Sequence, residues 1–120
     1  MGLKRFVVEL GMGVDLHGEN MTKAACRAVR NAIGRSCLCG LIEILGLESL
    51  EEVQVEILVA CPDPGRVDRD VVAAEVPIGR ATVKVIPGGM TAPGICVDRF
   101  AKDCDRIAVA NVAITVSVDS

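Results

Sequence analysis

The first third of the chain is patterned as a strand, a loop and a long helix. Apolar and polar side chains alternate in part over residues 4–10, which favours a β-strand. Glycines and polar residues dominate residues 11–20, which we interpret as a loop. Asn20 is a favourable helix N-cap, and apolar residues recur at helical spacing over residues 21–45. We therefore predict one long helix that is bent near Gly34 and ended by Gly46.

The rest of the chain is patterned as strands separated by short helices. Residues 53–60 give the clearest strand, because Val and Ile occupy every second position until Cys61-Pro62 ends the run. Asp68 is suited to cap a short helix that reaches residue 74. The remaining predicted elements are a strand over residues 82–86 that Pro87-Gly88-Gly89 stops, a short helix over residues 95–104, and a last strand over residues 107–118.

The predicted order of elements is β-α-β-(α)-β-(α)-β. This order describes an α/β or α+β fold with a four-stranded sheet, one long helix and one or two short helices. At 120 residues the chain fits a single domain over residues 1–120.

The amino-acid composition leads us to expect that the chain associates with further copies of itself. Hydrophobic residues make up 51% of the chain, which excludes a disordered protein. The strands over residues 53–60 and 107–118 carry apolar residues on both faces, and one long helix cannot cover both faces of a sheet. We therefore expect a homo-oligomer, and a trimer first of all. The alternative is that the short helices cover the second face.

Charge and targeting signals exclude several classes of partner. The net charge is −3 and no run of Lys or Arg occurs, so nucleic acid is not an expected partner. Apolar stretches such as residues 107–118 are shorter than the roughly 20 residues of a membrane-spanning helix. The N-terminus does not resemble a signal peptide, so we expect a cytoplasmic protein with reduced thiols at its six cysteines. Cys61 is the cysteine that could be exposed as a nucleophile, because it ends a strand before a Pro/Gly loop.

The loop over residues 11–20 is the first candidate site, because it joins a strand to a helix N-terminus. Its glycines do not match a dinucleotide fingerprint or a phosphate-binding P-loop, and the sequence points to no particular cofactor. Asp15, His17 and Glu19 alternate, so in an extended stretch they would point the same way. We expect Asp15, Glu19 and Asn20 to bind ligand and His17 to act as an acid/base group. A divalent metal ion is an alternative ligand of the three alternating side chains, and a merely solvated loop is the other.

Lys84 and the Gly88-Gly89 turn form a second candidate site. Lys84 on a sheet face could stabilise a carboxylate or carbonyl, and the two glycine amides could bind an oxyanion. Arg27, one turn before Arg30 on the predicted helix, could reach an acidic ligand. The alternatives are an edge-strand lysine, a plain turn and a solvated helix face.

Three segments carry a resemblance to a known family: GMGVDLHGENMTKAACRAVRNAI, VKVIPGGM and ANVAITVSVD. They resemble a small family of conserved hypothetical bacterial proteins of about this length, named after a Listeria protein. This resemblance spans nearly the whole chain and implies no catalytic residues. The order of elements is also similar to one unit of the ring-opening amidohydrolases, the cyanuric acid hydrolase and barbiturase group, and to small trimers of the chorismate mutase type. That similarity of topology implies ligand sites in clefts between subunits.

The sequence thus favours a homo-oligomer that binds a small polar or anionic metabolite at inter-subunit clefts. If the protein is an enzyme, hydrolysis of a cyclic amide is the expected reaction, with His17 as acid/base and Lys84 as electrostatic stabiliser. Two alternatives stay open. One is a non-catalytic structural or regulatory oligomer, and the other is a metal-binding protein that uses the three alternating side chains and a cysteine.

Overall fold

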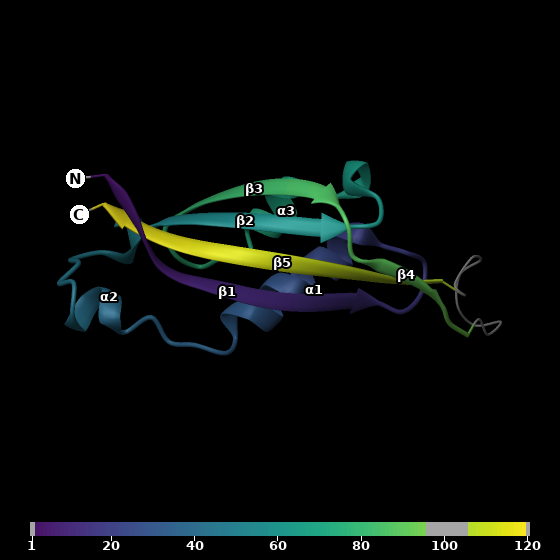
Figure 1. The fold of residues 1–120 in the computed structure, drawn as a ribbon, viewed down its shortest axis with the longest axis horizontal. Coiled ribbons are helices and arrows are strands. Elements are labelled where there is room, and N and C mark those ends of the chain that lie inside the picture. Colours follow the sequence, from purple (N-terminus) through teal and green to yellow (C-terminus); the bar gives the residue numbers. More distant parts are fainter. Residues whose placement is uncertain (1, 96–105, 120) are drawn as a thin grey trace.

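A curved five-stranded sheet forms the body of the protein in the computed structural model, which describes residues 2–95 and 106–119. The four long strands lie in the order β1-β5-β2-β3, and the short β4 pairs with β5 (Figure 1). Their bounds are β1 Leu3–Asp15, β2 Gln54–Cys61, β3 Arg80–Pro87, β4 Met90–Pro93 and β5 Arg106–Asp119. β2 and β3 are parallel, whereas β5 pairs antiparallel with β1, β2 and β4.

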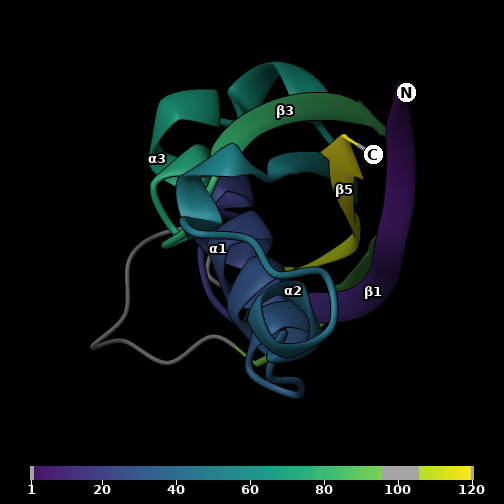
Figure 2. The same ribbon diagram turned by 90° about the vertical axis from the view of Figure 1, so that its left-hand side faces the viewer.

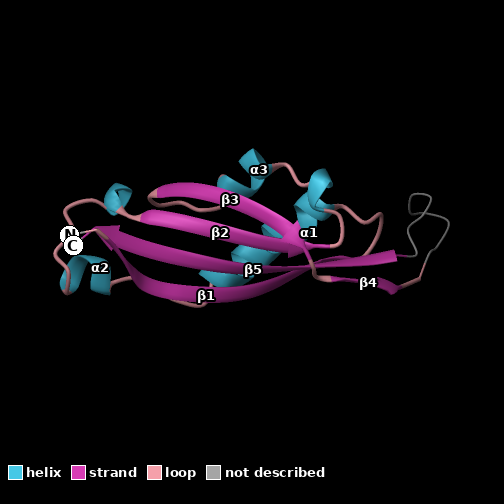
Figure 3. Cartoon of the chain, turned by 45° about the horizontal axis from the view of Figure 1, so that its top comes forward, coloured by secondary structure: helices cyan, strands magenta, loops and turns pink. Residues whose placement is uncertain are grey.

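The α+β class and the single domain agree with the sequence-based prediction, but the sheet has five strands instead of four. The sequence predicted no strand over the residues of β4. β4 forms because the chain leaves β3 through Gly88-Gly89 and continues along β5 beyond the end of β2 (Figure 3). Its pairing depends on a distant segment, which local sequence does not reveal. The predicted helix over residues 95–104 lies almost entirely outside the described residues, and Ile95 itself is not helical.

The predicted long helix is wrong, because the structure breaks it into two. Helix α1 (Met21–Ile33) begins at Asn20, whose side chain accepts a hydrogen bond from the Lys23 amide, and it ends at Gly34. A short helix, α2 (Gly40–Glu43), and one turn of 3-10 helix over Leu50–Glu52 follow before the chain reaches β2. Glycine inside a helix costs about 1 kcal/mol relative to alanine, and the apolar residues beyond Gly34 pack onto the sheet from a loop instead.

α1 and α2 lie on the concave side of the sheet, which curves around α1 (Figure 2). The short α3 (Arg69–Ala73), capped by the Asp68 side chain as predicted, packs against α1 and β3 on that same side. The buried core lies between α1 and the inward-facing residues of β2 and β5. The convex face of the sheet therefore carries no helix among the described residues.

β1 continues through Gly11 and Gly13 into what was predicted as a loop. Both glycines face α1, and a Cβ atom on either would overlap the helix backbone around Ala24 and Ala28. The glycines therefore let the helix lie directly on the strand. No described helix is long and apolar enough to cross a membrane.

Candidate functional site

The turn between β1 and α1 is organised around the buried carboxylate of Asp15. Its Oδ2 accepts a hydrogen bond from the Asn20 amide at 2.8 Å. Its Oδ1 lies 3.7 Å from Nη1 of Arg27, which also donates to the Val14 carbonyl at 2.7 Å. Asp15, Asn20 and Arg27 thus lie together, although the sequence placed Arg27 in a separate candidate site, and their contacts hold the end of the strand against the start of the helix.

The rest of this turn does not have the extended geometry assumed for it. Gly18 and Glu19 both have positive φ angles, 87° and 49°, so the chain reverses after the half-buried His17. Asp15 points inward, whereas the Glu19 carboxylate lies 3.8 Å from Nε of Arg106 at the start of β5. Among residues 2–95 and 106–119, no three His, Cys, Asp or Glu side chains converge on a metal-sized site.

The Gly88-Gly89 segment is a close crossing of chain over sheet. The Gly88 amide donates to the Cys61 carbonyl at 3.0 Å, which commits that N–H to the backbone. Gly89 has a φ of 65°, and a Cβ there would overlap the Val109 carbonyl. Only glycine fits this position, because the chain both turns left-handed and touches β5.

Lys84 lies on the convex face, beside a shallow groove of about 380 Å³ over β2 and β3. Glu56 and Thr82 share that face, since Thr82 pairs with Glu56 across the two strands. The described residues give Lys84 no ion pair. The sequence already placed Thr82 on the same face of its strand as Lys84. It missed Glu56, although the alternation that marks β2 places that residue on the outward side.

The two candidate sites do not meet within one chain. Asp15 pairs with Ala108 on β5 and faces the helix, whereas Lys84 pairs with Leu58 and faces outward. Leu58 lies on β2, which pairs with the edge of β5 opposite to β1. Its partner on β5 is Ala113, five positions along that strand from Ala108. Any site that combines Lys84 with the β1–α1 turn therefore needs a second subunit.

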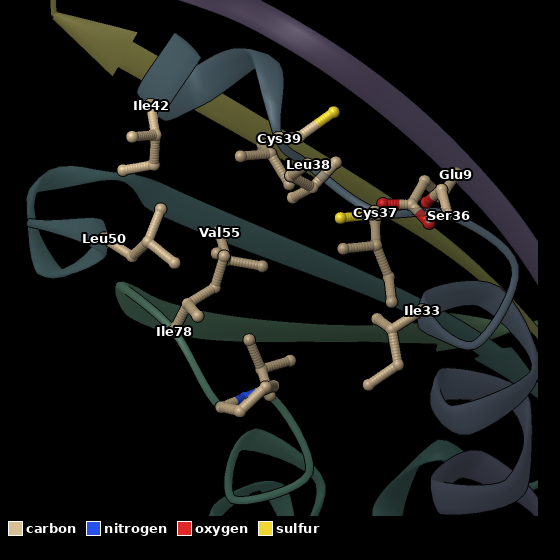
Figure 4. A pocket seen from close by; sticks show the side chains of 14 residues that line it. Glu9, Ile33, Ser36, Cys37, Leu38, Cys39, Ile42, Leu50, Val55 and Ile78 are labelled. Atoms are coloured by element: carbon tan, nitrogen blue, oxygen red, sulfur yellow. Dashed lines mark hydrogen bonds between the residues drawn. The ribbon is translucent and has the colours of Figure 1, made fainter. Parts of the chain in front are cut away.

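A third feature, which the sequence did not reveal, is an apolar pocket of about 380 Å³ on the concave side. α1 has 13 residues and spans about 20 Å, whereas the 14 residues of β5 span about 46 Å. The segment between α1 and β2 bridges the uncovered half of the sheet and leaves the pocket beneath it (Figure 4). At one end Ser36 Oγ donates to Glu9 Oε2 at 2.7 Å. The signal for Glu9 was available, since it shares a face of β1 with Gly11 and Gly13.

Comparison with known proteins identifies the family of this chain and a solved structure with a similar fold. The model of the conserved hypothetical protein family Lin0512 matches residues 5–116. The chain belongs to the Lin0512 family. A solved structure from Nostoc punctiforme, described as an FtsZ-like protein of unknown function, is 40% identical to it with a TM-score of 0.90. That match covers 100% of this chain and 99% of the other. No curated protein matches at a significant level.

In this Lin0512 family member the buried cysteines are structural. Cys61 is fully buried, so the hypothesis of an exposed nucleophile at the end of β2 is wrong. Burial raises the pKa of the Cys61 thiol, and burial together with the nearby Glu75 carboxylate raises the pKa of the Cys26 thiol. Both thiols therefore stay protonated and unreactive at neutral pH. Cys37 and Cys39 are exposed beside the apolar pocket.

Proposed function

We propose that the protein acts as a homo-oligomer, a trimer first of all, that binds a small anionic metabolite between subunits. The observation that carries this proposal is the apolar strip on the convex face of the sheet. Its members are large hydrophobic side chains that solvent reaches although they lie in regular strands: Val8, Leu10, Met12, Leu58 and Met90. Leu10 is 66% exposed and Met12 is 53% exposed.

A contiguous apolar strip of this kind favours association by its face. Burying apolar surface contributes about 25 cal/mol per Å², and soluble monomers rarely leave such strips uncovered. The alternative that short helices cover this face is not supported by α3, which packs on the concave side.

The outer edge of β1 is not open to pairing with a strand of another chain, because side chains of α1 and of the turn after it already form hydrogen bonds with its backbone. The Met12 amide donates to Oδ1 of Asn31 at 3.1 Å, and the Leu10 and Val14 carbonyls accept from Arg35 and Arg27. Arg27 and Asn31 lie four residues apart on α1, and Arg35 follows four residues later in the turn after the helix, so the three side chains line the edge of the strand. A capped edge resists pairing with another chain.

The groove beside Lys84 supports the second part of the proposal, the binding of a small anionic metabolite. It lies on the same convex face as the apolar strip, so a subunit seated on the strip would border it. The Lys84 ammonium suits a carboxylate or a polarised carbonyl, and the Thr82 hydroxyl offers a further hydrogen bond.

The reaction that such a cleft would serve is hydrolysis of a cyclic amide. His17 of an adjoining subunit would take a proton from the attacking water and return it to the leaving nitrogen. Lys84 would stabilise the negative charge that develops on the carbonyl oxygen. Asp15, Asn20 and Arg27 would hold the turn that carries His17, and Glu19 and the Gly88-Gly89 turn would border the cleft.

The decisive experiment for assembly is size-exclusion chromatography with light scattering on the unmodified protein and two variants. Leu10→Asp places a charge in the apolar strip and should yield monomers. Ile44→Asp is the matched control, because Ile44 is 80% exposed near α2 and lies away from the strip. A monomeric unmodified protein, or an oligomer that withstands Leu10→Asp, would refute assembly through this face.

The ligand is tested by melting temperature in the presence of small carboxylates and cyclic amides. A ligand of the native state raises the melting temperature. The increase should disappear in Lys84→Ala and persist in Lys23→Ala, a control lysine on the exposed side of α1. An oligomer whose melting temperature responds to none of these compounds would favour the non-catalytic structural or regulatory role instead.

A further inference from the structure

We propose that the concave-side pocket is a separate binding site for a small aliphatic amine. The pocket lies under the segment between α1 and β2, on the side of the sheet opposite the apolar strip and the Lys84 groove. The proposal therefore does not depend on the assembly or the ligand proposed above.

The walls of the pocket come from five separated parts of the chain and are almost entirely aliphatic. The inward faces of β2 and β5 supply Val55, Ile114 and Val116 as the floor. Ile33 at the end of α1 closes one side, and Leu50 and Ile78 lie across from it (Figure 4). Such a lining accepts hydrocarbon and rejects a highly polar molecule.

One end of the pocket is acidic. Figure 4 shows Glu9 and Ser36 together beside Cys37, at the end of the pocket near Ile33. Glu9 accepts the Ser36 hydroxyl, forms no ion pair within the described residues, and is the only charged side chain among those that line the pocket. A carboxylate without a counter-ion beside an apolar wall is complementary to an ammonium group. The same charge disfavours a carboxylate or phosphate ligand.

The volume of the pocket limits the length of the amine that it can hold. At about 30 Å³ for each water-sized group, a volume of about 380 Å³ holds about a dozen non-hydrogen atoms. A linear amine of six to ten carbons fits this space with its nitrogen at Glu9. Each added methylene that reaches the floor should raise affinity about fourfold until the pocket is full.

Isothermal titration calorimetry with n-octylamine, 1-octanol and octanoate tests the proposal on the unmodified protein. These probes have the same chain and differ in the polar group. We expect saturable binding of one octylamine per chain, at least tenfold tighter than octanol, and no binding of octanoate. Octanoate that binds as tightly as octylamine, or octylamine that binds without a defined stoichiometry, would overturn the proposal.

Two variants and a matched control locate the site. Glu9→Gln should reduce octylamine affinity to that of octanol, whereas Glu56→Gln on the convex face should leave both unchanged. Val76→Phe fills the pocket from its rim and should weaken both probes at least tenfold. Octylamine binding that survives Glu9→Gln or Val76→Phe would place the amine elsewhere and refute this site. Circular dichroism of each variant confirms that it has folded.

Discussion

At the scale of single residues, the fold depends on two glycines of β1, because they have no side chain where the helix packs on the strand. Gly11 and Gly13 stand where α1 touches β1, and the helix residues opposite them are small: Ala24, Ala28 and Ala32. Four further positions of α1 are buried against the sheet or its neighbours: Met21, Ala25, Cys26 and Val29. The close approach therefore depends on both partners, glycine in the strand and alanine in the helix.

Gly13→Ala should destabilise the protein strongly. The added methyl would overlap the backbone of Ala24 and Ala28, which cannot move without shifting the helix. Overpacking of this kind costs about 1–3 kcal/mol. Urea denaturation should show that loss, while Gly65→Ala, where the nearest atom is 3.8 Å from the new methyl, should stay close to the unmodified protein. Equal stability of the two variants would contradict the packing described for α1.

Glu75 gives the protein a pH-dependent contribution to stability. Arg30 donates to both carboxylate oxygens at 2.7 and 2.8 Å, and this hydrogen bonding lowers the pKa of Glu75 below its ordinary value. A lowered pKa in the folded state contributes stability above the unfolded-state pKa of about 4.3. That contribution is lost as the pH falls through the folded-state pKa.

Glu75→Gln should therefore reduce the free energy of unfolding at pH 7, and the difference from the unmodified protein should shrink as the pH falls below about 4. Chemical denaturation at a series of pH values measures it. Asp70→Asn, in the exposed first turn of α3, is the control and should show little difference at any pH. A Glu75→Gln difference that is the same at pH 3 and pH 7 would exclude the ion pair as its cause.

At the scale of elements, the sequence predicted those whose pattern is local. Alternation located β2 and β5, and the side chains of Asn20 and Asp68 marked the starts of α1 and α3. The errors lie where a distant segment decides. Gly11 and Gly13 are typical of a loop until α1 packs on them, and β4 is a strand only because β5 extends beyond β2.

The candidate site followed the same rule. The sequence named Asp15, Asn20 and Arg27 as ligand candidates without grouping them, and the structure brings them into contact because they are close along the strand and the helix that follows it. It could not reveal the Glu9 pocket, whose walls come from five separated parts of the chain. It also could not show that Gly18 and Glu19 turn the backbone and separate Asp15 from Glu19.

Asp15→Ala should weaken the junction of β1 and α1. It leaves the Asn20 amide without its acceptor and Arg27 without its nearby carboxylate. Loss of a buried hydrogen-bonded carboxylate costs about 1–3 kcal/mol. Thermal and urea denaturation should show this loss, whereas Glu19→Ala on the same turn should cost less than about 1 kcal/mol because its ion pair is partly exposed and 3.8 Å long. If both variants were equally stable, Asp15 would not be the residue that organises the turn.

At the scale of the whole molecule, the two faces of the sheet have different roles. The concave face holds the core, α1 and the Glu9 pocket, whereas the convex face exposes the apolar strip and the Lys84 groove. A chain with 51% hydrophobic residues and a sheet covered on one side leaves apolar surface exposed, and we propose that a second copy covers it. Capping of the β1 edge by α1 would restrict the proposed contact to the convex face and the β3 edge.

Association through the convex face makes stability depend on protein concentration. Each tenfold dilution removes about 1.4 kcal/mol for every subunit contact that dissociates on unfolding. The melting temperature of the unmodified protein should therefore fall by several degrees between 100 and 1 μM, roughly as expected for a domain of this size. Leu10→Asp should melt at a lower temperature that does not change with dilution, because its subunits are already separate. Differential scanning fluorimetry over this range measures both. A melting temperature that is independent of concentration in the unmodified protein would mean that the apolar strip stays exposed in solution, and the inter-subunit cleft would then have no basis.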